Sequence, residues 1–286
     1  MKRLFLSTAV IAVLPMAAVA DSGTVTLGYG QTGDGGNTDF DSLMLNGTFS
    51  RDMGNGVMVD LTGRSNRLDD GSDVAEIYDV FGSVSYRFAN GLTAGAYLQR
   101  FALDDGGSLT LDSYGLTLGY SLSNFEVDAY VGRSELDSGA GADLDDWGLS
   151  ASYSTPETGV YAAYQSMEEG GDKIEMTGLG GHYKFRSGFA LFGGVIGADV
   201  EGDDYQVAGI GGSYAFDAGL SGRPLVLSGE YRRGEDKTFG DDFDGFALMV
   251  TLPFGDADGA VPDSSVAGSI ANPGYSAYGT FYDTAF

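Results

Sequence analysis

The chain has 286 residues, of which 41 are acidic and 15 basic, and its formal net charge is −26. This charge repels nucleic-acid phosphates and argues against a nucleic-acid partner. No cysteine is present, so disulfides and thiolate metal sites are excluded, and no segment beyond the amino terminus is apolar over the ~18 residues of a transmembrane helix.

The amino terminus has the pattern of a secretory signal peptide. Lys2 and Arg3 precede an apolar run that ends in the small-residue site Ala18-Val19-Ala20. Pro15 interrupts this run, and the run is shorter than the roughly 20 residues of a membrane-spanning helix, which disfavours an uncleaved anchor. We predict that residues 1–20 are removed, which leaves 13 basic residues against 41 acidic ones.

The following residues alternate between apolar and polar positions, the pattern of strands with one buried face. Fourteen segments are predicted to be strands, at residues 22–31, 40–50, 55–65, 75–88, 91–102, 109–121, 124–134, 145–153, 158–167, 174–185, 188–198, 205–216, 224–233 and 243–254. Their even number and their length of about 10 to 12 residues predict an all-β, antiparallel transmembrane barrel with both chain ends in the periplasm. Twelve or sixteen strands are the alternatives.

The connections between these strands fall into two alternating kinds. Compact turns such as Ala89-Asn90-Gly91 are expected in the periplasm, and acidic, mostly longer loops outside the cell. Aromatic residues at the turn-proximal strand ends predict an interfacial girdle, which a soluble β-sandwich does not need. They are Phe88, Tyr120, Tyr153, Tyr183, Phe185, Phe216 and Phe254. The acidic loops predict a negatively charged external vestibule of Asp69, Asp70, Asp73, Asp104, Asp105, Glu201, Asp203, Asp204, Glu235, Asp236, Asp241 and Asp242.

The order of these features resembles that of bacterial outer-membrane general porins and their relatives over residues 21–254. The resemblance rests on the signal peptide, the Gly/Asp-rich loops and strand phrases such as residues 146–153. It implies a passive pore in the outer membrane, with membrane lipid and the barrel-assembly machinery as partners, and leaves a homotrimer open. General porins usually have sixteen strands, a third external loop that constricts the lumen and no extension after the last strand. Here no loop of that length is found, and 32 residues follow Phe254.

Ten charged residues on the less apolar strand faces are predicted to line the lumen, because Lys or Arg at the lipid midplane would cost roughly 2–4 kcal/mol. They are Asp60, Arg64, Asp79, Arg87, Glu126, Asp128, His182, Lys184, Glu230 and Arg232. These residues either pair to stabilise the wall or select solutes, and walls of opposite sign would create a transverse field. Small inner residues, such as Gly180 and Gly209, leave space, which favours an aqueous pore in a barrel of this size.

An outer-membrane lipase or protease is the rival class of function. His182 is the only histidine and faces the lumen near the periplasmic end of its strand, where neither chemistry needs it, and the chain has no G-x-S-x-G motif. No acidic segment completes a calcium-binding loop, and we expect no cofactor or metal. The sequence therefore predicts a passive, cation-preferring channel for small hydrophilic solutes, with a non-conducting structural or adhesive barrel as the alternative.

Residues 255–286 are the least typical segment. They are rich in Gly, Ala and Ser and contain Pro262 and Pro273, which predicts little regular structure, but aromatic residues gather near the end. The segment is expected to be a disordered periplasmic tail, a lumenal tail that narrows the pore, or an added strand with an assembly signal at Phe286. The predicted organisation is a signal peptide (1–20), a barrel (21–254) and a periplasmic or lumenal tail (255–286).

Overall fold

The computed structural model describes residues 20–33, 39–137, 142–170, 172–200, 202–217, 223–238 and 241–285. Residues 1–19 of the predicted signal peptide lie outside the described residues. The strands are β1 (Ser22–Gly33), β2 (Asp39–Gly54), β3 (Val57–Asp69), β4 (Val74–Arg87), β5 (Leu92–Asp104), β6 (Ser108–Leu122), β7 (Phe125–Asp137), β8 (Ala142–Ser154), β9 (Thr158–Glu169), β10 (Asp172–Lys184), β11 (Phe189–Val200), β12 (Asp203–Asp217), β13 (Pro224–Asp236) and β14 (Asp241–Gly255).

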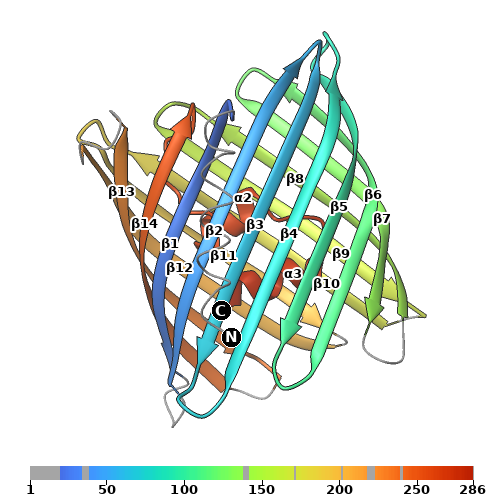
Figure 1. The fold of residues 1–286 in the computed structure, drawn as a ribbon, viewed down its shortest axis with the longest axis vertical. Helices are drawn as coiled ribbons and strands as arrows, with labels where there is room; N and C mark the ends of the chain where they lie inside the picture. Colours follow the sequence, from blue (N-terminus) through green and yellow to red (C-terminus); the bar gives the residue numbers. More distant parts are fainter. Residues whose placement is uncertain are drawn as a thin grey trace, which may run out of the picture.

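These fourteen strands form one closed antiparallel barrel, as the sequence predicts (Figure 1). Each strand pairs with its neighbours in the chain, and β14 closes the barrel against β1 in a continuous register from Ser22–Gly255 to Gly33–Asp244. Closure gives the backbone N–H and C=O groups of every strand a ladder partner, the condition under which strands cross lipid. In the described part of the chain, no helix is long and apolar enough to cross a membrane.

The two ends of the barrel differ in composition but not in the length of their connections. Ser22 and Gly255 lie at one end, which we call the turn end, and the acidic connections lie at the other, the loop end (Figure 1). The strands have 12 to 16 residues, and loop-end connections such as 70–73 and 105–107 are as short as turns. The expectation that the external loops are mostly longer is therefore wrong. Beyond the lipid both strand faces are solvated, so the alternation fades before the hydrogen-bonded ladder ends.

The outer face of the barrel carries the apolar half of the alternation. Leu98, Leu116 and Ile210 are 64–70% exposed there, as expected for side chains that face lipid. Six of the seven expected girdle aromatics are also exposed. Phe254 differs, because its ring packs over Gly23 and is buried.

The segment after β14, which we call the tail (residues 256–285), lies inside the barrel and contains α2 (Val266–Ala271) and α3 (Ala277–Ala285) (Figure 1). Of the three expected arrangements, this is the lumenal one. The expectation of little regular structure is wrong, since both prolines lie outside the helices, where they remove no helical hydrogen bond. Ser265 caps α2 by accepting a 3.0 Å hydrogen bond from the Gly268 N–H group.

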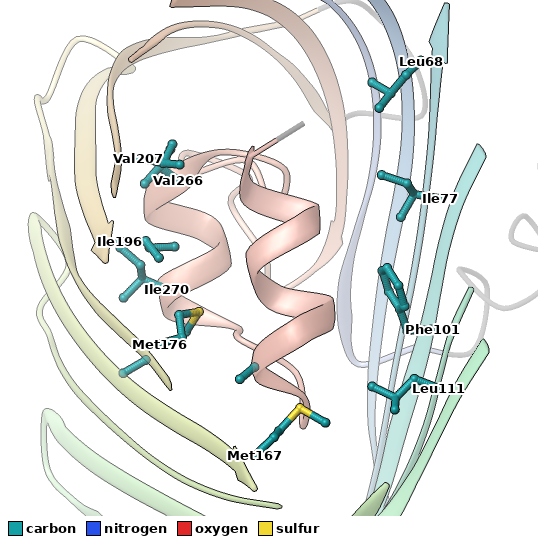
Figure 2. Close-up of a cluster of buried hydrophobic side chains, with 12 residues drawn as sticks. Leu68, Ile77, Phe101, Leu111, Met167, Met176, Ile196, Val207, Val266 and Ile270 are labelled. Carbon is teal, nitrogen blue, oxygen red and sulfur yellow. The ribbon is translucent and has the colours of Figure 1, made fainter. Parts of the chain in front are cut away.

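The loop-end half of the lumen is an apolar core shared by the wall and the tail. The two helices stand between opposite walls, and side chains from both walls point toward them (Figure 2). We call this set the loop-end cluster. It comprises Leu68, Ile77, Phe101, Leu111, Ala163, Met167, Met176, Ile196, Val207, Val266, Ile270 and Ala277. The tail therefore supplies the partner surface that these inward apolar residues need.

Candidate solute pathway in the lumen

The turn-end half of the lumen contains a cavity of about 540 Å³. Asp60, Glu126 and Asp128 of the wall line it together with Asp258 and Asp263 of the tail. These carboxylates come from β3, β7 and the tail, which are brought together only by closure of the barrel. The described residues that line this cavity include five acidic side chains and no basic one. Lys184 pairs with one of the five, Asp258, and the remaining carboxylates give the cavity a negative potential between low-dielectric walls.

A second cavity, of about 220 Å³, adjoins the same three wall carboxylates and also contacts Arg87. Asp60 of β3 lies with Glu126 and Asp128 of β7 around both cavities, and the transverse field between walls of opposite sign stays a prediction. Strand register, which the sequence does not specify, decides this grouping.

Lys184 lies at the turn-end side and contacts the tail. Its Nζ atom donates to Asp258 Oδ2 at 2.6 Å. Burial by itself would raise the pKa of Asp258, but the hydrogen bonds from Lys184 and from the Ala260 N–H group outweigh it and hold this pKa below its ordinary value. Asp258 is therefore charged at neutral pH and anchors the start of the tail.

Four of the predicted lumen residues form two buried ion pairs in the middle of the barrel. Glu230 and Arg232 lie 2.7 Å apart, and Arg64 lies 3.8 Å from Asp79, its register partner on β4. All four side chains are at most 6% exposed. Buried charges need this pairing and further hydrogen bonds to offset their lost hydration.

The tail supplies those further hydrogen bonds through its backbone. The Val266 N–H group donates to Glu230 at 3.0 Å, and Arg232 donates to the Ser264 and Thr284 carbonyl oxygens. Arg64 donates to the Asn272 carbonyl oxygen at 2.5 Å. These wall charges thus hold the tail in place, a role that the sequence did not indicate.

His182 faces the lumen and its Nδ1 atom lies 2.6 Å from the Tyr161 hydroxyl oxygen. Tyr161 is on the adjacent strand β9, so this contact joins two parts of the wall. The geometry is that of a wall hydrogen bond, in keeping with the sequence interpretation of this residue.

Sequence reasoning missed an aromatic cluster at mid-lumen. Phe81, Tyr97 and Tyr130 of the wall surround Tyr275 of the tail, and we call the three wall residues the aromatic cage. Glycines that were expected to leave an open pore instead make room for other groups. The cage rings pack against Gly115 and Gly148, and α2 packs against Gly180 and Gly209. The signal available in the sequence was the aromatic content of the tail, without a partner to assign to it.

A sequence model of the Gram-negative porin family matches residues 54–196, half of the chain. The chain belongs to this family. It is a porin of the outer membrane, in agreement with the predicted family, fold and location. A search of curated protein sequences finds no match to the porin.

Solved structures with the same fold include two outer-membrane proteins of low sequence identity. An anion-selective porin from Comamonas acidovorans has a TM-score of 0.53 and 10% identity, over 82% of this chain and 98% of that one. A Pseudomonas aeruginosa FadL homologue has a TM-score of 0.52 and 12% identity, over 85% of this chain and 92% of that one. These similarities show the fold of the porin and leave its solute open.

The predicted vestibule carboxylates are distributed over both faces of the porin's loop end. By alternation from buried or lipid-facing neighbours, Asp69, Asp104, Asp204, Glu235 and Asp242 point outward from strand ends, whereas Asp203 and Asp236 share the inward face. The remaining described ones, Asp70, Asp73 and Asp105, lie in connections. Glu201 and the Asp241 side chain lie outside the described residues. The loop-end charge therefore surrounds the mouth instead of only lining it.

Proposed function

We propose that this porin is a passive, non-enzymatic channel for small hydrophilic solutes and that it prefers cations. The turn-end cavity carries this proposal, because five carboxylates and no basic side chain stand among its described lining residues. A wide space of one charge sign concentrates counter-ions and excludes co-ions. The outward loop-end carboxylates add a long-range field that attracts cations to the mouth when the salt concentration is low.

The tail takes the place of a constriction loop in this proposal. It fills the loop-end half of the lumen, and the cavities of about 540 and 220 Å³ adjoin it on the turn-end side. Continuous flow of ions therefore requires the tail to shift. We expect low or intermittent conductance from the full chain and a wider pore when the tail is absent.

The filled lumen also favours the alternative function, a non-conducting structural barrel. The loop-end cluster is packed as a protein core, and burial of a large apolar side chain stabilises by roughly 1.5–3 kcal/mol. A tail held by several such contacts and by hydrogen bonds to the two buried ion pairs can keep the pore shut. The two functions make opposite predictions for conductance.

Planar-bilayer recording in a salt gradient separates them. The full chain and a variant that lacks residues 256–286 are compared, and heat-modifiable gel mobility confirms that each barrel has folded. We expect a cation-selective reversal potential and a larger conductance for the truncated variant. A reversal potential that favours anions contradicts the cation preference, and folded barrels that never conduct leave the structural alternative.

A further inference from the structure

Tyr275 of the tail occupies the aromatic cage as a small ligand would. Its ring stacks on Tyr97, with the centroids 4.1 Å apart and an angle of 17° between the planes. Tyr130 and Phe81 meet it edge-on, at 5.5 and 5.9 Å. Stacked and edge-to-face contacts at these distances are the favoured arrangements of aromatic pairs.

Wall side chains hydrogen-bond two of the cage rings, and one of these side chains, Gln165, also donates to the Gly274 carbonyl oxygen of the tail at 3.1 Å. The Tyr97 hydroxyl donates to Asp146 at 2.8 Å, and the Gln165 amide donates to the Tyr130 hydroxyl at 3.1 Å. The wall positions against which these rings pack are glycines. A Cβ atom at Gly132 would overlap the Tyr97 hydroxyl, and one at Gly148 would overlap the Tyr130 ring. The strands therefore hold Tyr97 independently of the tail and leave room for the Tyr130 ring.

Polar groups around Tyr275 define what else could occupy the cage. The Gln99 side chain accepts from the Tyr275 N–H group at 2.7 Å, and Asp79 fixes this amide by accepting from it at 2.8 Å. Ser83, Asp60 and Asp128 line both lumenal cavities together with Tyr275. These carboxylates repel an anionic substituent, whereas a neutral hydroxyl group can donate to them.

We propose that the aromatic cage is a binding site for neutral phenolic solutes, which Tyr275 occupies as an intramolecular ligand. The inference rests on the proposed function, because a solute reaches the cage only through the lumen. Access is available from the turn end, since both lumenal cavities are lined in part by Tyr275 and by Phe81 of the cage. A phenol that displaces Tyr275 would take over its ring contacts and place its hydroxyl group toward the cavities that Asp60 and Asp128 line.

Binding of 4-methylphenol, the side-chain analogue of tyrosine, tests the proposal on the full chain in detergent. Ligand-observed NMR titration compares the wild type with Tyr275→Ala and with Tyr278→Ala, which removes a tail ring outside the cage. We expect Tyr275→Ala to bind at least about ten-fold more tightly than the wild type, a difference of 1.4 kcal/mol. The Tyr278→Ala variant should match the wild type.

Two further comparisons identify the cage as the site. Adding Phe81→Leu or Tyr97→Leu to Tyr275→Ala should weaken binding, and either variant serves if the other fails to fold. Neither 4-methylcyclohexanol, which lacks the aromatic ring, nor 4-methylbenzoate, which is anionic, should bind as 4-methylphenol does. The proposal is overturned if 4-methylcyclohexanol binds as tightly as 4-methylphenol, or if Tyr275→Ala does not raise the affinity for 4-methylphenol. The aromatic cage is then only a part of the packed interior. The NMR titration measures binding and not ion flow, so its outcome is separate from that of the bilayer recordings. If the phenol binds but the recordings show no conductance, the channel function is contradicted and the binding site stands.

Discussion

Adjacent arginines on β13 face opposite sides of the wall and have different partners. Arg232 points inward, is 5% exposed and binds Glu230 and two carbonyl oxygens of the tail. Arg233 points outward and pairs with Asp242, and both side chains are about half exposed. Exposed pairs of this kind contribute little to stability, whereas a broken buried pair leaves an uncompensated charge.

We therefore predict that Arg232→Met releases the tail and that Arg233→Met does not. Removing one partner of a buried pair costs about 3–5 kcal/mol, and Glu230 regains water only when the tail leaves. The tail contains no Lys or Arg but has Tyr275, Tyr278, Phe281 and Tyr282, so chymotrypsin and mass spectrometry report its release. The double variant with Glu230→Gln should hold the tail better than Arg232→Met alone. Equal protection of the tail in both single variants would contradict the role of the buried pair.

At the scale of elements, α2 packs closely against strands β10 to β12 because glycines lie on their inner faces. A Cβ atom at Gly194 would lie 2.7 Å from Ile270 Cδ1, and one at Gly178 would lie 2.8 Å from Cγ1 of the same side chain. Glycine in a strand interior often marks such a close approach of another segment. The glycines are thus part of the contact surface for α2.

We predict that Gly194→Leu displaces α2 and that Gly197→Leu, a change on the outer face of the same strand, leaves it in place. Overpacking of a close contact costs about 1–3 kcal/mol. At Gly197 the nearest atom to an added Cβ is the Tyr205 carbonyl oxygen, 4.0 Å away. Single-channel recordings should show more frequent openings for Gly194→Leu than for the wild type. Similar opening rates in the two variants would mean that α2 does not limit conduction.

At the scale of the whole molecule, lumenal and outward carboxylates contribute differently to ion selectivity. We predict that the triple variant Asp60→Asn, Glu126→Gln, Asp128→Asn loses most of the cation preference. A matched triple variant at the loop end, Asp104→Asn, Asp204→Asn, Glu235→Gln, should lose it mainly below about 0.1 M salt, where the Debye length exceeds ~10 Å. Permeability ratios measured at two salt concentrations check both. An unchanged ratio in the lumenal variant would assign selectivity to the loop end.

The barrel could be predicted from the sequence because successive residues of a membrane-spanning strand face lipid and lumen in turn, so apolar and polar residues alternate along it. The alternation around Val57–Leu61 and Phe246–Val250 already separates the two faces, and counting the segments that alternate gives the even number of strands. The position of the tail could not be predicted, since it depends on contacts between residues far apart in the chain, such as Gln99 with Tyr275. Inner glycines are likewise ambiguous. A glycine on the inner face leaves space for water in an open pore, and it equally leaves space for a helix to pack closely against the wall.

The covalent connection between Tyr275 and the wall sets a concentration scale for any competing solute. About twenty residues separate the end of β14 from this ring. A short flexible linker alone would give an effective concentration in the millimolar range, and the packing of α2 against the wall raises it above that value. A phenol of equal intrinsic affinity must approach that concentration before it occupies half of the cages. A phenol present below this concentration would leave Tyr275 in the cage. A phenol present above it would displace Tyr275 and enter the cage in its place.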